Sequence, residues 1–125
     1  MKKFFFIFLA LTLSLQIFGE EVMEKINNDT YVVRTATLCS VKGYKSPTPL
    51  EVYINKKGVV TKVIALPNRE TPKYFKQIKE LFIPKLSGKK LKDIDKLDAV
   101  TGATMSSDAV KENVKAALEY FKKHK

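Results

Sequence analysis

The stretch that decides the fold reads Leu50-Glu51-Val52-Tyr53-Ile54-Asn55-Lys56-Lys57-Gly58-Val59-Val60-Thr61-Lys62-Val63-Ile64-Ala65-Leu66. Leu50 to Ile54 and Val59 to Leu66 are rich in apolar and β-branched residues, which favours two strands. Asn55 to Gly58 lies between them, and Gly58 can supply the left-handed conformation that a tight hairpin needs. We therefore predict a β-hairpin in this stretch.

The chain ahead of the hairpin predicts one further strand and a loop. Residues 20–29 are polar and charged, with a few apolar residues spaced as in a short helix. Thr30 to Val41 is rich in β-branched residues and predicts the first strand. The glycine and the two prolines of Gly43 to Pro49 then indicate a loop.

Two helices are predicted after the hairpin. Thr71 is a suitable N-cap for the first of them, with Pro72 at the first helical position. Its apolar face is expected to contain Tyr74, Phe75, Ile78, Leu81 and Phe82. Pro84 is expected to end this helix, and residues 85–97 are expected to form an irregular loop.

The second helix is predicted from Ser107 to Lys122. Its expected buried face consists of Val110, Val114, Ala117, Leu118 and Phe121. Strands that precede helices along a chain in this way indicate an α+β fold. We expect a small, mainly antiparallel sheet with the helices packed on one face.

The chain is basic and poor in cysteine and histidine. Its 125 residues carry a formal net charge of +10, which can attract acidic partners or an anionic membrane surface. The lysines are scattered, without an arginine-rich block or a nucleic-acid motif, so no nucleic-acid partner is expected. The single cysteine, Cys39, excludes an internal disulfide and is expected to be a buried thiol in the first strand. His124 is the only histidine, and the sequence offers no cluster of metal ligands.

Residues 1–19 have the pattern of a secretory signal. Lys2 and Lys3 precede an apolar run from Phe4 to Phe18, and Gly19 suits the position before a cleavage. The run is shorter than the roughly 20 residues of a spanning helix. We therefore expect a protein of the periplasm or cell envelope, with residues 20–29 as a lead-in and 30–125 as one domain. An uncleaved, membrane-associated N-terminal segment is the alternative.

Four hydroxyl side chains and a glycine stand directly ahead of the last helix, in the stretch Asp98-Ala99-Val100-Thr101-Gly102-Ala103-Thr104-Met105-Ser106-Ser107. A helix start has unpaired N–H groups and a positive dipole end, so it can bind a phosphate. Gly102 would allow the backbone to approach a ligand closely. In an ordinary helix entry, Ser106, Ser107 or Asp108 would cap the helix, with Thr101-Gly102 as a turn. Such capping is compatible with a cofactor site, and we expect it in either case.

Asp98 to Thr104 resembles the Asp-x-x-(Ser/Thr)-Gly-Ala-Thr motif of the FMN-binding domain family, known from subunits of sodium- and proton-linked membrane electron-transfer complexes. In that family the last Thr carries FMN through a phosphoester bond. The resemblance implies that Thr104 is the attachment residue. It also implies a cofactor site formed by the neighbouring residues Thr101, Gly102, Ala103, Met105 and Ser106.

Attachment of FMN by Thr104 alone is poorly supported by the sequence. A threonine hydroxyl is a weak nucleophile unless a base lies beside it, and no histidine is near Thr104 in the chain. The resemblance implies a separate flavin transferase that moves FMN from FAD onto this residue. Asp98 matches the acidic residue of the motif and is expected to help that enzyme recognise the site.

The resemblance extends upstream and covers roughly residues 31–121. Glu70-Thr71-Pro72 occurs in the family's order, so Glu70 and Thr71 are expected flavin contacts, although an acid and a hydroxyl also favour a helix start. Tyr44 could stack on the flavin ring or cover the edge of the core. Lys73-Tyr74 is a departure, because the family often has glycine after this motif.

These observations predict an exported FMN-binding electron-transfer flavoprotein that passes electrons between a membrane donor and an extracytoplasmic acceptor. No acid–base pair or nucleophile–base set is evident, so an electron carrier is favoured over a self-contained enzyme. The alternatives are FMN held without a covalent bond, a secreted basic module that binds anionic polymers or membrane surfaces, and an accessory structural protein of the envelope.

Overall fold

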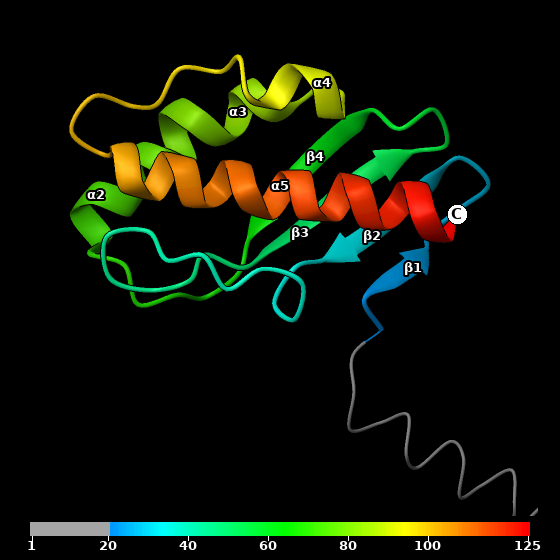
Figure 1. Cartoon of the computed structure of the whole chain (residues 1–125), viewed down its shortest axis with the longest axis horizontal. Helices are drawn as coiled ribbons and strands as arrows, with labels where there is room; N and C mark the ends of the chain where they lie inside the picture. The colour runs from blue at the N-terminus through cyan, green and yellow to red at the C-terminus, as the bar shows by residue number, and fades with distance from the viewer. Residues whose placement is uncertain (1–20) are drawn as a thin grey trace, which may run out of the picture.

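A four-stranded antiparallel sheet and a layer of helices make up the structure, a computed structural model in which residues 21–125 are described (Figure 1). The strands are β1 (Met23–Lys25), β2 (Thr30–Arg34), β3 (Leu50–Asn55) and β4 (Val60–Ala65), in that order across the sheet. The helical segments are α2 (Pro72–Gln77), the π-helix η1 (Ile78–Phe82), α3 (Ile83–Leu86), α4 (Leu91–Ile94) and α5 (Thr104–His124). The predicted α+β fold is thus confirmed, while the predicted signal segment, residues 1–19, lies outside the described residues.

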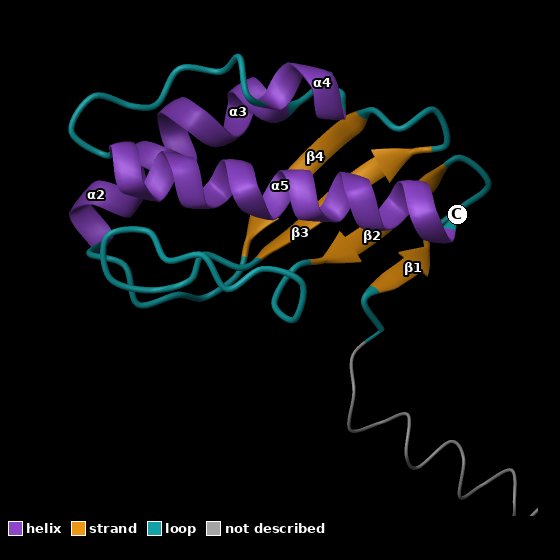
Figure 2. Cartoon of the chain, in the orientation of Figure 1, coloured by secondary structure: helices purple, strands orange, loops and turns teal. Residues whose placement is uncertain are grey.

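The hairpin that the sequence predicts is present as β3 and β4. Gly58 has a φ of 81°, the left-handed conformation expected of it. The Asn55 side chain accepts hydrogen bonds from the N–H groups of Lys57 (2.9 Å) and Val59 (3.1 Å), which stabilises the turn. Figure 2 shows this pair of strands beneath the helices.

The prediction for the N-terminal part was wrong at two points. The expected helical lead-in contains strand β1, which pairs with β2 through Met23 and Val33; pairing with a neighbouring strand overrides a weak helical spacing. The first strand ends at Arg34 instead of Val41, because the chain turns at Thr35, whose carbonyl accepts hydrogen bonds from the N–H groups of Leu38 and Cys39. Cys39 is therefore in a turn and only half-buried.

The first helical region also differs from the prediction. Pro84 does not end it, because this residue stands in the first turn of α3, where a missing N–H costs no intrahelical bond. The buried face is narrower than expected, since Tyr74 and Leu81 are exposed. The segment predicted as an irregular loop contains the end of α3 and all of α4.

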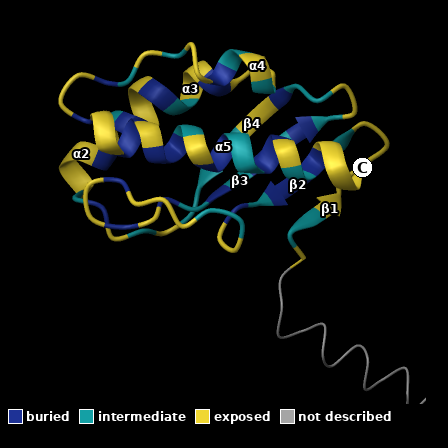
Figure 3. Cartoon of the chain, viewed as in Figure 1, coloured by how far each residue is buried: buried dark blue, intermediate teal, exposed yellow. Residues whose placement is uncertain are grey.

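Helix α5 packs across β2 and β3, and the core lies between them (Figure 3). The five core residues predicted for this helix are all buried. At its far end, the ring of Phe121 meets that of Tyr31 edge-on, with 5.2 Å between centroids. None of the helices described in residues 21–125 has the length and apolar character that a membrane crossing requires.

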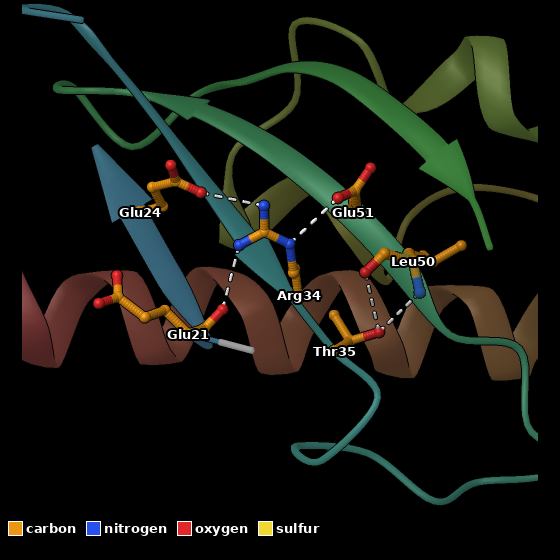
Figure 4. A network of polar contacts seen from close by, with 6 residues as sticks. All are labelled: Glu21, Glu24, Arg34, Thr35, Leu50 and Glu51. Atoms are coloured by element: carbon orange, nitrogen blue, oxygen red, sulfur yellow. Dashed lines mark hydrogen bonds and ion pairs between the residues drawn. The ribbon is translucent and has the colours of Figure 1, made fainter. Parts of the chain in front are cut away.

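Polar contacts fix the strands and α5 relative to one another. Buried Thr35 accepts a hydrogen bond from the N–H of Leu50 (2.9 Å) and donates one to the side chain of Asn113 in α5 (2.5 Å). Next to it, Arg34 lies between the carboxylates of Glu24 (3.0 Å) and Glu51 (3.1 Å), so that three strands are joined (Figure 4). The hydrogen bond with Glu24 raises the pKa of Arg34 above its ordinary value.

Candidate functional site

Two loops, α2 and the first turn of α5 surround a cavity of about 320 Å³ at one end of the molecule. The lining residues are Tyr44, Tyr74, Gly102, Ala103, Thr104, Met105 and Ser106. Five of these seven belong to the motif stretch that the sequence singled out. In Figure 1 this end of α5 lies beside α2, and the chain enters it from the long connection after α4.

Thr104 is the first residue of α5 and is exposed. Gly102 has a φ of 83°, and the N–H of Ala103 donates to the carbonyl of Val100 (2.9 Å), so that Thr101-Gly102 forms the predicted turn. Ala103 is the N-cap residue, and no side chain caps the helix. The first-turn N–H groups of α5 therefore have no side-chain oxygen as a partner and can receive an anion.

The expected capping by Ser106, Ser107 or Asp108 was wrong, because α5 begins three residues earlier than predicted and encloses them. Buried Ser107 accepts a hydrogen bond from the N–H of Val100 (3.0 Å) and donates one to the carbonyl of Ala103 (2.8 Å). This serine holds the motif loop against the helix. Its role could not be distinguished from capping in the sequence alone.

Glu70 is buried and joins the parts of the site to one another. Its carboxylate accepts hydrogen bonds from the N–H groups of Tyr44 (2.8 Å), Lys45 (2.6 Å) and Ser46 (3.3 Å), and from the hydroxyl of Ser106 (2.9 Å). These donors come from a loop and from α5. Glu70 thereby fixes the position of the Tyr44 loop relative to the first turn of α5.

Gly43 is needed for this arrangement because the loop approaches Glu70 closely. A Cβ at Gly43 would lie 1.8 Å from Oε1 of Glu70, which would force the carboxylate out of its place. Glu70 and Thr71, which the sequence predicts as flavin contacts, are not among the lining residues of the cavity. Their direct contact with a flavin stays a prediction.

Large side chains surround the mouth of the cavity. The rings of Tyr44 and Tyr74 lie 6.3 Å apart at an angle of 60°, and 61% and 41% of their surfaces are exposed. Met105 is 57% exposed on the same cavity. Tyr74 was assigned to the core by its spacing, and its place at the site was missed; its position next to the Glu-Thr-Pro segment was the available signal.

Asp98 and Thr101 are exposed and do not line the cavity. Their positions keep them accessible at the surface of the motif loop. A role for Asp98 in recognition by another protein stays a prediction, as does a cofactor contact by Thr101.

The site offers chemistry that suits a phosphate joined to a flat aromatic group. An exposed hydroxyl and uncapped N–H groups lie at the helix start, where the dipole favours an anion. Two tyrosine rings and a methionine provide apolar and aromatic surface beside them. The residues present therefore fit FMN.

Comparison with known protein families agrees with this chemistry. The family model described as FMN-binding domain matches residues 43–119, which include both loops of the site and most of α5. No curated protein and no solved structure was found to match the chain. Because the matched residues make up more than half of the chain, the protein belongs to the FMN-binding domain family, and FMN is the cofactor that this membership supports.

Proposed function

We propose that the protein is an exported electron-transfer flavoprotein that carries FMN on Thr104. The observation that carries the proposal is the place of this threonine. It is exposed, it is the first residue of α5, and it lines the cavity next to N–H groups without a side-chain cap. The hydroxyl therefore stands where a helix start favours a phosphate.

Attachment needs a second protein, since Thr104 has no base beside it in the sequence. His124 is at the opposite end of α5, and 21 helical residues at about 1.5 Å each separate the two by roughly 30 Å. A flavin transferase would join Oγ1 of Thr104 to the phosphorus of the FMN half of FAD as the pyrophosphate bond breaks. A base of that enzyme would take the hydroxyl proton, and AMP would leave. The exposed Asp98 and Thr101 would be available to that enzyme.

In the finished protein, the bound flavin would supply the redox chemistry, and the chain would hold and orient it. Tyr44, Tyr74 and Met105 would contact its ring from the mouth of the cavity. Their exposure would let a redox partner approach the same edge. A membrane donor and an extracytoplasmic acceptor are the partners proposed, in line with the signal-like residues 1–19.

The test is the intact mass of the protein produced together with a flavin transferase. The expected result is an added mass of one FMN group and flavin fluorescence that survives denaturation. Thr104→Ala should lose both, whereas Thr37→Ala, which removes an exposed threonine hydroxyl outside the motif, should keep them.

Two other results would contradict the covalent proposal. Flavin that is bound by the folded protein but released on denaturation would indicate a non-covalent site. A colourless, unmodified protein, with a transferase that is active on another substrate, would exclude the attachment. Fractionation of the producing cells would test export separately, and a protein found only in the cytoplasm would contradict it.

A further inference from the structure

A second cavity, of about 510 Å³, lies at the opposite end of α5 from Thr104. It is formed by the turn of the β3–β4 hairpin, the start of α4 and the end of α5, which Figure 1 shows together near the C-terminus. Its lining residues are Lys57, Gly58, Lys90, Leu91, Lys92, Leu118, Phe121, Lys122 and Lys125. We call it the lysine groove.

The groove combines an apolar floor with a cationic rim. Half-buried Leu91 forms the accessible part of the floor, above Leu118 and Phe121, which are nearly fully buried. The Lys125 ammonium lies 5.6 Å from the centroid of the Phe121 ring. Five of the nine lining residues are lysines, and no acidic side chain lines this cavity in the described chain. Within residues 21–125, no ion pair engages any of the five.

Stabilisation of the helix accounts for only part of this cluster. Lysines in the last turn of a helix complement its negative dipole end, which explains Lys122 and Lys125. Lys57, Lys90 and Lys92 lie outside α5, so the dipole of this helix does not account for them. Three segments far apart in sequence thus bring positive charge to one apolar cavity.

We infer that the lysine groove binds an anionic lipid. The ammonium groups would surround a negatively charged head group, and the floor and the lysine stems would pack against the acyl chain. An acidic peptide would use the charges but would have little use for the apolar floor. The occupant that fits both features is an anionic amphiphile, and lipid of an anionic membrane surface is its source.

This inference is independent of the flavin site. With α5 between them, the two sites are separated by roughly 30 Å. Substitutions in the groove should leave flavin attachment at Thr104 unchanged. Lipid binding would hold the protein at a membrane surface with the flavin end directed elsewhere.

The experiment is an NMR titration of the whole protein with dihexanoyl phosphatidylglycerol below its micelle concentration. The expected result is saturable shifts of the amides of Gly58, Leu91 and Leu118. Dihexanoyl phosphatidylcholine and glycerol phosphate are the two comparison ligands, since the first lacks the net charge and the second lacks the acyl chains. Both should bind clearly more weakly.

Matched variants test whether the groove or the overall charge is responsible. Lys92→Gln with Lys122→Gln should weaken binding roughly thirtyfold, at about fivefold for each lysine near an anionic lipid. Lys79→Gln with Lys85→Gln removes the same charge from exposed positions outside the groove and should have little effect. All variants keep the same N-terminal segment, so its own affinity for lipid is common to each.

Four results would overturn the inference. Equal weakening by both variant pairs would mean that net charge alone attracts the lipid. Equal affinity for glycerol phosphate would mean that the apolar floor is not used. Shifts at Thr104 and its neighbours alone would mean that the lipid binds outside the lysine groove. Tighter binding of an acidic peptide than of the lipid would mean that the partner is a peptide and not a lipid.

Discussion

The two ends of α5 are constructed in different ways. At the Thr104 end, polar contacts between distant residues hold the structure, with Glu70 and Ser107 as their centres. At the C-terminal end, Phe121 and Leu118 pack against the core, and the charged groups remain on the rim. The geometry of the first end therefore depends on hydrogen bonds, whereas that of the second end depends on packing.

Phe121→Ala should have the largest effect on stability. Removal of a fully buried aromatic ring that contacts Tyr31 should lower the free energy of unfolding by about 4 kcal/mol. Denaturant unfolding measures this loss. Flavin attachment per folded molecule should not change, because the site is at the other end; a loss of attachment in the folded fraction would show that the ends are coupled.

Glu70→Gln should lower stability by roughly 2–3 kcal/mol, because an amide cannot accept all four hydrogen bonds that the carboxylate receives. Unlike Phe121→Ala, it should also reduce flavin attachment in the folded fraction, since the Tyr44 loop would lose its position. Unfolding curves and in-gel flavin fluorescence measure the two effects. Glu80→Gln, at an exposed carboxylate, is the control.

Ser106→Ala removes one donor to the same carboxylate and should lower stability by about 1 kcal/mol. Some loss of attachment is expected along with it. Ser87→Ala removes an exposed serine hydroxyl far from the site and should be close to neutral. If the two substitutions had the same effect on unfolding, the bond from Ser106 to Glu70 would not contribute to stability.

Effects as small as that of Ser106→Ala are expected from a pair of glycines, one at each end of the molecule. Gly102 and Gly58 have φ values of 83° and 81°, and a Cβ on either would meet no atom within 4 Å. Gly102→Ala and Gly58→Ala should therefore each lower stability by about 1 kcal/mol, through backbone strain alone. Flavin attachment should fall only with Gly102→Ala. Equal flavin attachment in both variants would show that the conformation of Gly102 is not needed for attachment.

Elements with strong local signals could be predicted from the sequence. The hairpin was found because apolar strands flank a turn with glycine, and the buried face of α5 was found because its spacing is regular over three turns. Strand β1 was missed because three residues carry no clear period. The first strand was predicted to be too long because Thr35 is a β-branched residue, which is typical of strands. Its role in a buried hydrogen-bond network is not visible in the sequence.

The motif residues that line the cavity could be predicted from the sequence, but the residues that hold them in place could not. Five of the cavity's lining residues stand in one motif, so a single stretch identified them. The part played by Glu70 is different, because its donors are 24 to 36 residues away along the chain. No spacing or propensity indicates contacts at that separation. Tyr74 was misplaced for a related reason. The helical period puts it on the apolar face but does not show that other elements leave its side chain exposed.

The hydrogen bonds of Glu70 join residues far apart in sequence, and this has a consequence for the order of folding and flavin attachment. The Tyr44 loop, Glu70 and Ser106 can meet only after the sheet and α5 have come together, and such non-local contacts form late in folding. The cavity beside Thr104, which these contacts hold together, would then exist only in fully folded molecules. A flavin transferase that recognises this cavity would not modify incompletely folded chains, so flavin would be attached only to folded molecules.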